Sequence, residues 1–404
     1  MKKFFIFIIF WLGVVFSRNH PNSYVIEQIQ ECWDSEYPIV FGVLGDNYSA
    51  NWIFRSIVRQ LNSISDSLDF IVAVGDLAAG GDSVGYARYM ALIDSLNVPL
   101  ISVMGNHELN DSLGWERFIE FFGHPDFHFD VGDARFICIT NCFPTSEPVS
   151  GSENVYYMYF ESQLEWLEEK LSEWDGYKFV FIHAPPYLLG HITIATVGGF
   201  GSAPDYEESL TEEFTNILRD NDVYICFGGH IHAYDRWTPN NELYGDVTYI
   251  LTGGAGASII PIWPYPAPYG GPIYHFLIME LYEDGTINGH LVRPDTIDDG
   301  HTIVEYDSLY EFRLYPPSRI SAQIGAKPQQ EIIVHPNPFN DVLNIYVGGT
   351  DNQISIYDIS GKLVERISQK SGKQIIRWKP KPDIPGGVYT IKANDSSLKI
   401  FYIP

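Results

Sequence analysis

Six side chains that commonly bind metal ions each follow directly after an apolar stretch of the sequence. Two are aspartates, one is an asparagine and three are histidines: Asp46, Asp76, Asn106, His183, His230 and His232. Mixed carboxylate, amide and imidazole ligands suit zinc, manganese or iron rather than calcium or a structural thiolate site. Six ligands exceed the number that one tetrahedral ion needs. The set therefore predicts two metal ions, divalent or trivalent, with one carboxylate bridging them.

These residues need a sheet that brings the ends of distant strands together. Apolar stretches such as 39–44, 70–74 and 99–104 have the character of strands, and segments with helical spacing separate them. Strands that alternate with helices predict an α/β sheet, in which the loops at the carboxyl ends of the strands converge on one edge. His230 and His232 are two residues apart, so in an extended segment both would point to the same side.

The motifs around these residues resemble those of the calcineurin-like metallophosphoesterase family. They are Gly45-Asp46, Gly75-Asp76, Gly105-Asn106-His107-Glu108, Ile182-His183-Ala184-Pro185 and Gly229-His230-Ile231-His232; the following Ala233-Tyr234-Asp235-Arg236 resembles the purple-acid-phosphatase branch. The resemblance covers residues 38–294. It implies a four-layer α/β fold, in which two packed mixed β-sheets are flanked by helices and a dinuclear site lies at the sheet ends.

The resemblance also implies a role for each residue of the site. Asp76 would bridge the two ions, and the others would complete them: Asp46 and His232 at the first ion, and Asn106, His183 and His230 at the second. A metal-bound hydroxide would attack phosphorus. His107 would face the leaving-group oxygen, where histidine is suited to protonate the departing alkoxide. Glu108 or a neighbouring carboxylate could hold the other ring nitrogen of His107.

Two positions near the first ion depart from the family's pattern. Many members carry a histidine two residues after the first aspartate, where this chain has Tyr48. The purple enzymes carry a tyrosine three residues after the second aspartate, where this chain has Ala79. Either water fills the place, or Tyr48 supplies a phenolate oxygen, or Tyr48 packs at the rim of the site. We expect no purple phenolate-to-iron absorption unless Tyr48 is the replacement.

The composition excludes several classes of protein. Hydrophobic residues make up 45% of the 404 residues, enough for a packed core, so the chain is not a disordered polyelectrolyte. The formal net charge of -26 argues against a nucleic-acid or anionic-membrane partner, because both need a basic surface. The four cysteines match no zinc ribbon or redox pair, and the sequence does not decide whether they form disulfides: Cys32, Cys138, Cys142 and Cys226.

The N-terminus has the pattern of an export signal. Lys2 and Lys3 precede an apolar run from Phe4 to Phe16, which is too short to span a bilayer. We interpret residues 1–17 as a secretory signal peptide, and the alternative is a short buried helix. No later apolar run is long enough to span a membrane.

The C-terminal part has the pattern of a small all-β sandwich. It follows an irregular connector at 295–330, in which a last strand is expected near 310–314. Residues 331–404 resemble the C-terminal sorting domain of the type IX secretion system through a set of short motifs: Pro336-Asn337-Pro338-Phe339, Ile356-Tyr357-Asp358, Ser360-Gly361-Lys362-Leu363-Val364 and Gly387-Val388-Tyr389. The resemblance implies passage across the outer membrane, with release or surface attachment. The alternative is an accessory sandwich that binds carbohydrate or protein.

The sequence as a whole predicts a secreted or cell-surface phosphoesterase with two ions of zinc, manganese or iron. Its partners would be a small phosphate-ester substrate and the type IX secretion machinery. The alternative is a surface binding protein on the same fold with weak or no catalysis. The sequence does not distinguish phosphomonoesters from diesters.

Overall fold

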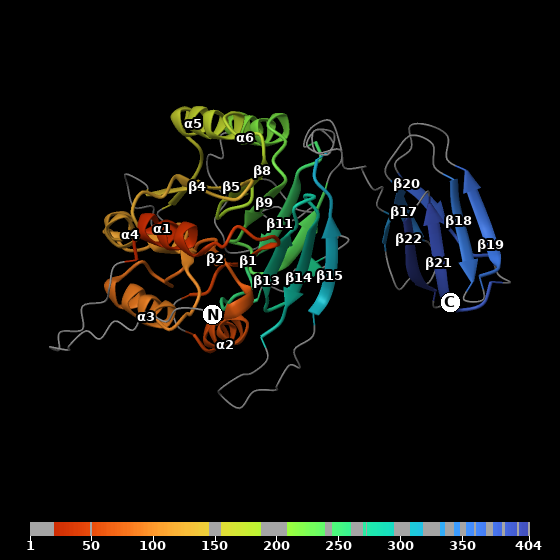
Figure 1. Ribbon diagram of the computed structural model, residues 1–404, viewed down its shortest axis with the longest axis horizontal. Helices are drawn as coiled ribbons and strands as arrows, with labels where there is room; N and C mark the ends of the chain where they lie inside the picture. The colour runs from red at the N-terminus through yellow and green to blue at the C-terminus, as the bar shows by residue number, and fades with distance from the viewer. Residues whose placement is uncertain are drawn as a thin grey trace.

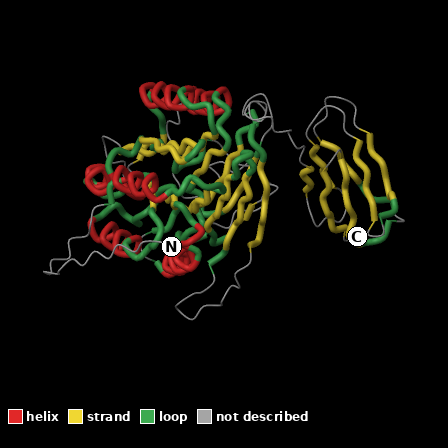
Figure 2. Tube along the Cα trace, in the orientation of Figure 1, coloured by secondary structure: helices red, strands yellow, loops and turns green. Residues whose placement is uncertain are grey.

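The fold is that of a computed structural model, shown in Figures 1 and 2. It describes residues 20–48, 51–144, 155–186, 208–238, 245–259, 270–271, 273–294, 308–317, 332–335, 343–347, 353–358, 361–368, 375–381, 384–393 and 396–402. The signal peptide expected at residues 1–17 lies outside these ranges, as does most of the connector expected at 295–330.

The first of two large sheets has six strands, in the order β15-β14-β13-β1-β2-β3. Its three N-terminal strands run parallel, and the other three are antiparallel to their neighbours. The strands are β1 (Ile39–Leu44), β2 (Phe70–Ala73), β3 (Leu100–Ser102), β13 (Phe276–Leu281), β14 (Ile287–Val292) and β15 (Ser308–Leu314). The strand expected near 310–314 is thus present as β15, and its pairing with β14 carries this sheet into the segment that we expected to be a connector.

The second sheet has seven strands, in the order β12-β10-β11-β9-β8-β5-β4. The four central strands β11, β9, β8 and β5 run parallel. The bounds are β4 (Phe127–Val131), β5 (Ala134–Cys138), β8 (Tyr177–Phe181), β9 (Ile225–Gly228), β10 (Tyr234–Trp237), β11 (Thr248–Thr252) and β12 (Gly270–Gly271). Nearly continuous apolar runs form the parallel strands, as expected of strands that are covered on both faces.

Aromatic side chains fill the space between the two sheets. Phe41 of β1 stacks on Phe70 of β2 with ring centroids 5.5 Å apart. Across the interface, Phe41 meets Phe136 of β5 edge-on at 5.4 Å, and Phe136 stacks on Phe179 of β8 at 5.1 Å. This apolar layer is the main core of the body and holds the two sheets face to face.

Helices cover the outer faces of both sheets, which completes four layers (Figure 1). Apolar side chains of α2 (Trp52–Ser63), α3 (Ser83–Ile93) and α4 (Gly114–Phe122) pack on the first sheet, and those of α5 (Glu161–Ser172) and α6 (Glu208–Asp220) pack on the second. The predicted four-layer α/β fold is therefore confirmed. Helix α2 begins where Asn51 caps it, since the Asn51 side chain accepts a hydrogen bond from the Phe54 N–H at 3.0 Å.

Shorter elements complete the body. They are α1 (Asn22–Cys32), the 3₁₀ turns η1 (Ser65–Ser67) and η2 (His107–Leu109), and the paired strands β6 (Cys142–Pro144) and β7 (Val155–Tyr157). The sequence analysis missed α1. Its first residue, Asn22, exchanges two hydrogen bonds of 2.9 Å with the backbone of Ser102, which ties the helix to β3.

The C-terminal strands form two small sheets with a core of their own, as predicted. One has the order β16-β17-β20 and the other β19-β18-β21-β22. The strands are β16 (Ile332–His335), β17 (Leu343–Val347), β18 (Gln353–Asp358), β19 (Leu363–Ser368), β20 (Ile375–Trp378), β21 (Gly387–Ala393) and β22 (Ser396–Tyr402). Buried side chains of both sheets, such as Ile345 and Ile356, belong to one apolar cluster. The sequence analysis did not predict β19.

Two features bear on the expectations about membranes and cysteines. Every helix within the described ranges is too short or too polar to cross a bilayer. All four cysteines lie in the described ranges and none is in a disulfide; three of them are buried: Cys138, Cys142 and Cys226. Burial raises the pKa of the Cys226 thiol and of the Cys138 thiol, so these two behave as small apolar side chains.

Candidate metal centre

All six residues predicted to bind metal lie at the carboxyl ends of strands in the two sheets. Asp46, Asp76 and Asn106 follow β1, β2 and β3 of the first sheet, whereas His183 follows β8 and His230 and His232 follow β9 of the second. All six are buried. The parallel strands of the packed sheets end at one edge, so residues as far apart as positions 46 and 232 become neighbours.

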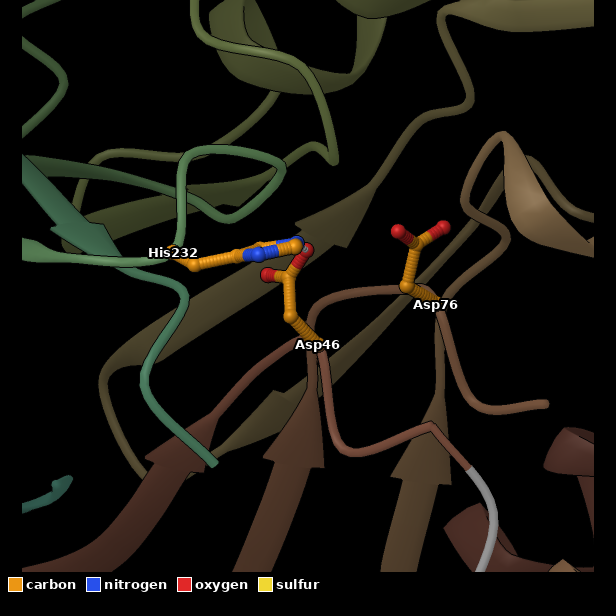
Figure 3. A group of neighbouring side chains, drawn as sticks. All are labelled: Asp46, Asp76 and His232. Carbon is orange, nitrogen blue, oxygen red and sulfur yellow. Dashed lines mark ion pairs between the residues drawn. The ribbon is translucent and has the colours of Figure 1, made fainter. Parts of the chain in front are cut away.

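One group consists of Asp46, Asp76 and His232. One potential ligand atom from each lies within 4.8 Å of those of the other two. In Figure 3 the imidazole of His232 lies beside the carboxylate of Asp46, and the carboxylate of Asp76 lies across from them. The His232 Nε2 atom is 3.5 Å from Asp46 Oδ1. The arrangement leaves two carboxylates and one imidazole nitrogen facing a common point.

The other group consists of Asn106, His183 and His230, which meet at one amide oxygen. Asn106 Oδ1 lies 2.8 Å from His183 Nε2 and 2.9 Å from His230 Nδ1. His183 Nε2 is also 3.3 Å from Asp76 Oδ1, so Asp76 belongs to the surroundings of both groups.

Backbone carbonyl groups fix the direction of two of these imidazoles. His183 Nδ1 donates a hydrogen bond to Val74 O at 2.8 Å, and His232 Nδ1 donates to Ser258 O at 2.8 Å. A carbonyl oxygen can only accept, so each ring carries a proton on Nδ1 and turns Nε2 toward the site. This is the usual support of a metal-binding histidine. It also leaves His183 Nε2 facing the Asn106 acceptor oxygen, an arrangement that a cation between them would satisfy.

The backbone of the site is strained at several of its residues. Asp46, Asp76 and His230 have positive φ angles of 59°, 54° and 70°. The segment around the last two histidines is not extended, so that expectation was wrong. Ile231 N donates to Gly229 O at 2.8 Å and Ala233 N donates to Ile231 O at 2.7 Å, which puts His230 and His232 at the centres of successive γ-turns. A γ-turn with positive φ is the rarer and more strained kind, and such strain concentrates at functional sites.

Glycines allow the strands to approach the two aspartates closely. A Cβ atom on Gly105 would lie 2.3 Å from Asp76 N and 2.5 Å from Asp76 Oδ1. A Cβ atom on Gly229 would lie 2.6 Å from Asp46 Oδ2. Neither position has room for a side chain without displacing a carboxylate, so these glycines are needed for the ligand geometry.

His107 lies beside the candidate metal ligands, and contacts hold both its backbone and its ring. Its backbone N–H donates to Asp76 Oδ1 at 2.8 Å, and its Nε2 atom is 3.9 Å from Asp76 Oδ2. Its Nδ1 atom lies 2.9 Å from the carbonyl oxygen of Ala79 and 3.1 Å from Asn110 Nδ2. The suggestion that Glu108 or another carboxylate holds this nitrogen is therefore wrong.

Glu108 instead joins the loops that follow β2 and β3. Its buried carboxylate accepts hydrogen bonds from the N–H groups of Asp76, Ala78 and Gly105, at 2.9, 2.9 and 2.8 Å. Three backbone donors occupy three of the roughly four acceptor positions of this carboxylate, so Glu108 is committed to the backbone. Its role is to fix the backbone on which Asp76 and Asn106 are mounted.

Tyr48 reaches into the same site from the loop after β1. Its hydroxyl is 2.7 Å from His107 Nε2 and 3.3 Å from His232 Nε2. Its backbone N–H donates to Asp76 O at 3.1 Å, and its φ angle is 45°. Tyr48 is thus directed at the candidate metal ligands and does not simply pack at the rim.

Comparison with known proteins agrees with this geometry. Residues 39–234, which carry all six side chains, match the calcineurin-like phosphoesterase family. This part of the chain belongs to that family. Residues 333–401 match the secretion system C-terminal sorting domain.

Curated relatives of the phosphoesterase domain include two kinds of protein. A probable cyclic nucleotide phosphodiesterase of Synechococcus sp. is 25% identical over 170 residues, covering 41% of this chain and 58% of the relative. Purple acid phosphatase 21 of Arabidopsis thaliana is 24% identical over 247 residues, covering 55% of this chain and 51% of the relative. The chain thus spans only part of each relative, between half and two thirds of its length.

A solved structure agrees in fold. Purple acid phosphatase PPD1 from yellow lupin seeds superposes with a TM-score of 0.53 at 16% identity, over 72% of this chain and 56% of that one. At this identity the likeness shows the fold of the phosphoesterase domain alone.

Ala79 lies in the loop after β2 of this domain and takes part in the site through its carbonyl oxygen.

The charges of the site favour a bound cation. Burial alone would lower the pKa of His183, but the charges of Asp76 and Asp46 outweigh it and raise the pKa to about 10. Burial raises the pKa of Asp46 well above its ordinary value. For Asp76, burial is outweighed by the charges of His183 and His107, which hold its pKa below the ordinary value. Positive charge within the phosphoesterase domain therefore stabilises the ionised form of Asp76.

Burial acts in the opposite direction on the other two imidazoles. It lowers the pKa of His230 to about 3, with the charge of His183 as a second cause, and it lowers the pKa of His232. Neutral imidazoles are the form that binds metal. The donor set, its backbone support and its charges all fit two metal ions.

Sequence reasoning missed the groups that support the ligands. Val74 O and Ser258 O are backbone atoms, which no residue type signals. Glu108 was noticed only as a possible partner of His107. The Glu that follows Gly-Asn-His in this chain did carry a signal, because a carboxylate in a glycine-rich strand end is well placed to accept backbone N–H groups.

Proposed function

We propose that this protein is a secreted or cell-surface phosphoesterase that hydrolyses phosphate esters at a dinuclear metal centre. The observation that carries the proposal is the convergence of two ligand groups on Asp76: Asp46 and His232 on one side, and Asn106, His183 and His230 on the other. Asp76 would bridge the ions, since its carboxylate is the one that borders both groups.

Two bound metal ions would supply a nucleophilic hydroxide near neutral pH and would hold the phosphate oxygens as charge develops. The protein's own contribution is to fix the ligands before substrate arrives. Val74 O and Ser258 O orient two imidazoles, the His230 N–H holds the Asp46 carboxylate, and the buried Glu108 holds the strand ends. This rigidity keeps the ligands from rearranging as the substrate's charge changes.

His107 is the residue that we assign to the leaving group. Its ring is more exposed than those of the other site histidines, with 17% of the side chain accessible against 0% for His183 and 7% for His232. Its Nδ1 atom is engaged by Ala79 O and Asn110 Nδ2, so Nε2 is the atom that can bring a proton to the departing alkoxide oxygen. No nucleophilic serine or cysteine is required.

The cellular location that we propose for this protein rests on the sorting domain at residues 333–401. We infer that the type IX secretion machinery recognises this part of the chain and that the phosphoesterase domain acts outside the cell. A substrate there would be a small phosphate ester, either a monoester or a diester, since both kinds of activity occur in the names of the relatives.

Metal analysis combined with turnover assays tests the proposal. The purified full chain should contain two ions of zinc, manganese or iron and should hydrolyse at least one of an aryl phosphate, a bis-aryl phosphate and a cyclic nucleotide. Treatment with a chelator should abolish turnover, and adding back the metal should restore it. A protein that holds two metal ions but turns over none of these substrates would favour the alternative, a surface binding protein on a phosphoesterase fold.

A further inference from the structure

We propose that Tyr48 is a metal ligand and completes the site formed by Asp46, Asp76 and His232. This inference rests on the proposed function, because it assigns a fourth protein side chain to the first of its two ions. Three side chains supply this group, and even a four-coordinate zinc ion has a further position to fill.

The distances between side-chain atoms carry the inference. Ligand atoms that bind one tetrahedral ion at about 2.0–2.2 Å lie roughly 3.3–3.6 Å from one another. His232 Nε2 lies 3.5 Å from Asp46 Oδ1 and 3.3 Å from the Tyr48 hydroxyl. The Tyr48 oxygen therefore stands at the same separation from His232 as an assigned ligand does.

The backbone of Tyr48 supports the same conclusion. Its φ angle of 45° is costly for an aromatic residue, and it shares a positive φ with Asp46, Asp76 and His230. Its N–H is tied to Asp76 O at 3.1 Å. The strained loop thus aims the Tyr48 ring at the same point as the neighbouring carboxylates.

A phenol must lose its proton to bind a metal ion as phenolate, and an acceptor is in place. His107 Nε2 lies 2.7 Å from the Tyr48 hydroxyl, within hydrogen-bonding distance. The transfer would move one proton from the Tyr48 oxygen to this nitrogen.

The test compares the full chain with Tyr48→Phe and with a matched control, Tyr86→Phe. Tyr86 is buried in α3, and its hydroxyl has no hydrogen-bond partner within the described ranges. Each protein is stripped of metal and loaded with ferric iron alone, and its visible spectrum is recorded. Each is also titrated with zinc in competition with a chromophoric chelator, which gives the affinity of both sites without reference to activity.

The wild type and Tyr86→Phe should show a phenolate-to-iron charge-transfer band that Tyr48→Phe lacks. In Tyr48→Phe, one of the two zinc ions should bind at least about 10–100-fold more weakly, which is the loss that follows even from removing an outer support of a ligand. An unchanged band and unchanged zinc affinities in Tyr48→Phe would overturn the inference, even if turnover fell, and would leave Tyr48 as a residue that positions His107. A wild type that takes up no metal would overturn the proposed function itself, so the two failures are distinguishable.

Discussion

The carboxylate of Asp46 accepts the backbone N–H of His230, with its two oxygens at 3.1 and 2.9 Å from that nitrogen, although 184 residues separate them in the chain. This contact joins the end of β1 in the first sheet to the end of β9 in the second. It holds one ligand with the backbone of another, so the two sheets cannot shift relative to each other without disturbing both groups of ligands.

Asp76 should be the least replaceable ligand, because it borders both groups. Asp76→Asn should lower the metal content from two ions and abolish turnover, since an amide is a weaker ligand and carries no charge to bridge two cations. Elemental analysis and an aryl phosphate assay measure this. Asp66→Asn, on an exposed residue of η1, is the control and should keep metal and activity. Full activity in Asp76→Asn would contradict the two-metal assignment.

His107→Ala should keep both metal ions but slow turnover by about 10²–10⁴-fold, the range typical of a lost general acid. The loss should be smaller for a nitrophenyl ester than for an alkyl ester, because nitrophenolate leaves without a proton. The exposed His124 provides the control, His124→Ala, which should leave the rates unchanged. Equal losses with good and poor leaving groups would instead indicate that His107 binds substrate.

Gly105→Ala should damage the metal centre without touching a ligand side chain. The added Cβ atom would lie 2.5 Å from Asp76 Oδ1, so the carboxylate has to move. We expect zinc affinity to fall by at least about tenfold, because misplacing a ligand resembles losing its support. Gly80→Ala is the matched control, since its Cβ would meet nothing nearer than 3.9 Å. Equal zinc affinity in the two variants would show that the strand ends are more adaptable than the packing indicates.

Asp235 should make the stability of the domain depend on pH. Neither of its buried oxygens has a hydrogen-bond partner in the part of the chain that the structure describes. Burial raises its pKa to about 8, and the nearby Arg236, which favours the charged form, does not offset this. The folded state therefore holds this proton more tightly than the unfolded state. The stabilisation that results is complete below the ordinary aspartate pKa and is lost as the pH rises to about 8.

The variant Asp235→Asn removes this titration while keeping the shape of the side chain. Its free energy of unfolding relative to the wild type should therefore rise between pH 5 and pH 8, by up to about 1.4 kcal/mol for each pH unit. Urea unfolding at both pH values measures the difference, with metal content checked in parallel. A constant difference between wild type and variant over this range would mean that the Asp235 carboxyl is not protonated in the folded state.

The order of most elements and the candidate ligand set could be predicted from the sequence by itself. Apolar runs such as 39–44 and 70–74 are typical of buried strands, and the polar motif after each run then lies at a carboxyl end. Each apolar run and its polar motif are adjacent in the chain, so this repeated pattern is visible in the sequence without a structure. The four-layer arrangement was implied by the family resemblance, and the all-β unit was predicted from its short strands and turns.

Only the tertiary structure decided how those side chains are held. The γ-turn at His230, the three backbone partners of Glu108 and the approach of Tyr48 to His107 and His232 all depend on contacts across the two sheets. The Tyr48 hydroxyl meets His232 across 184 positions of the chain, and His183 meets Val74 O across 109. Such partners include backbone atoms that every residue possesses, so residue type and spacing cannot reveal them, and only the packing of one sheet on the other selects which of them come together.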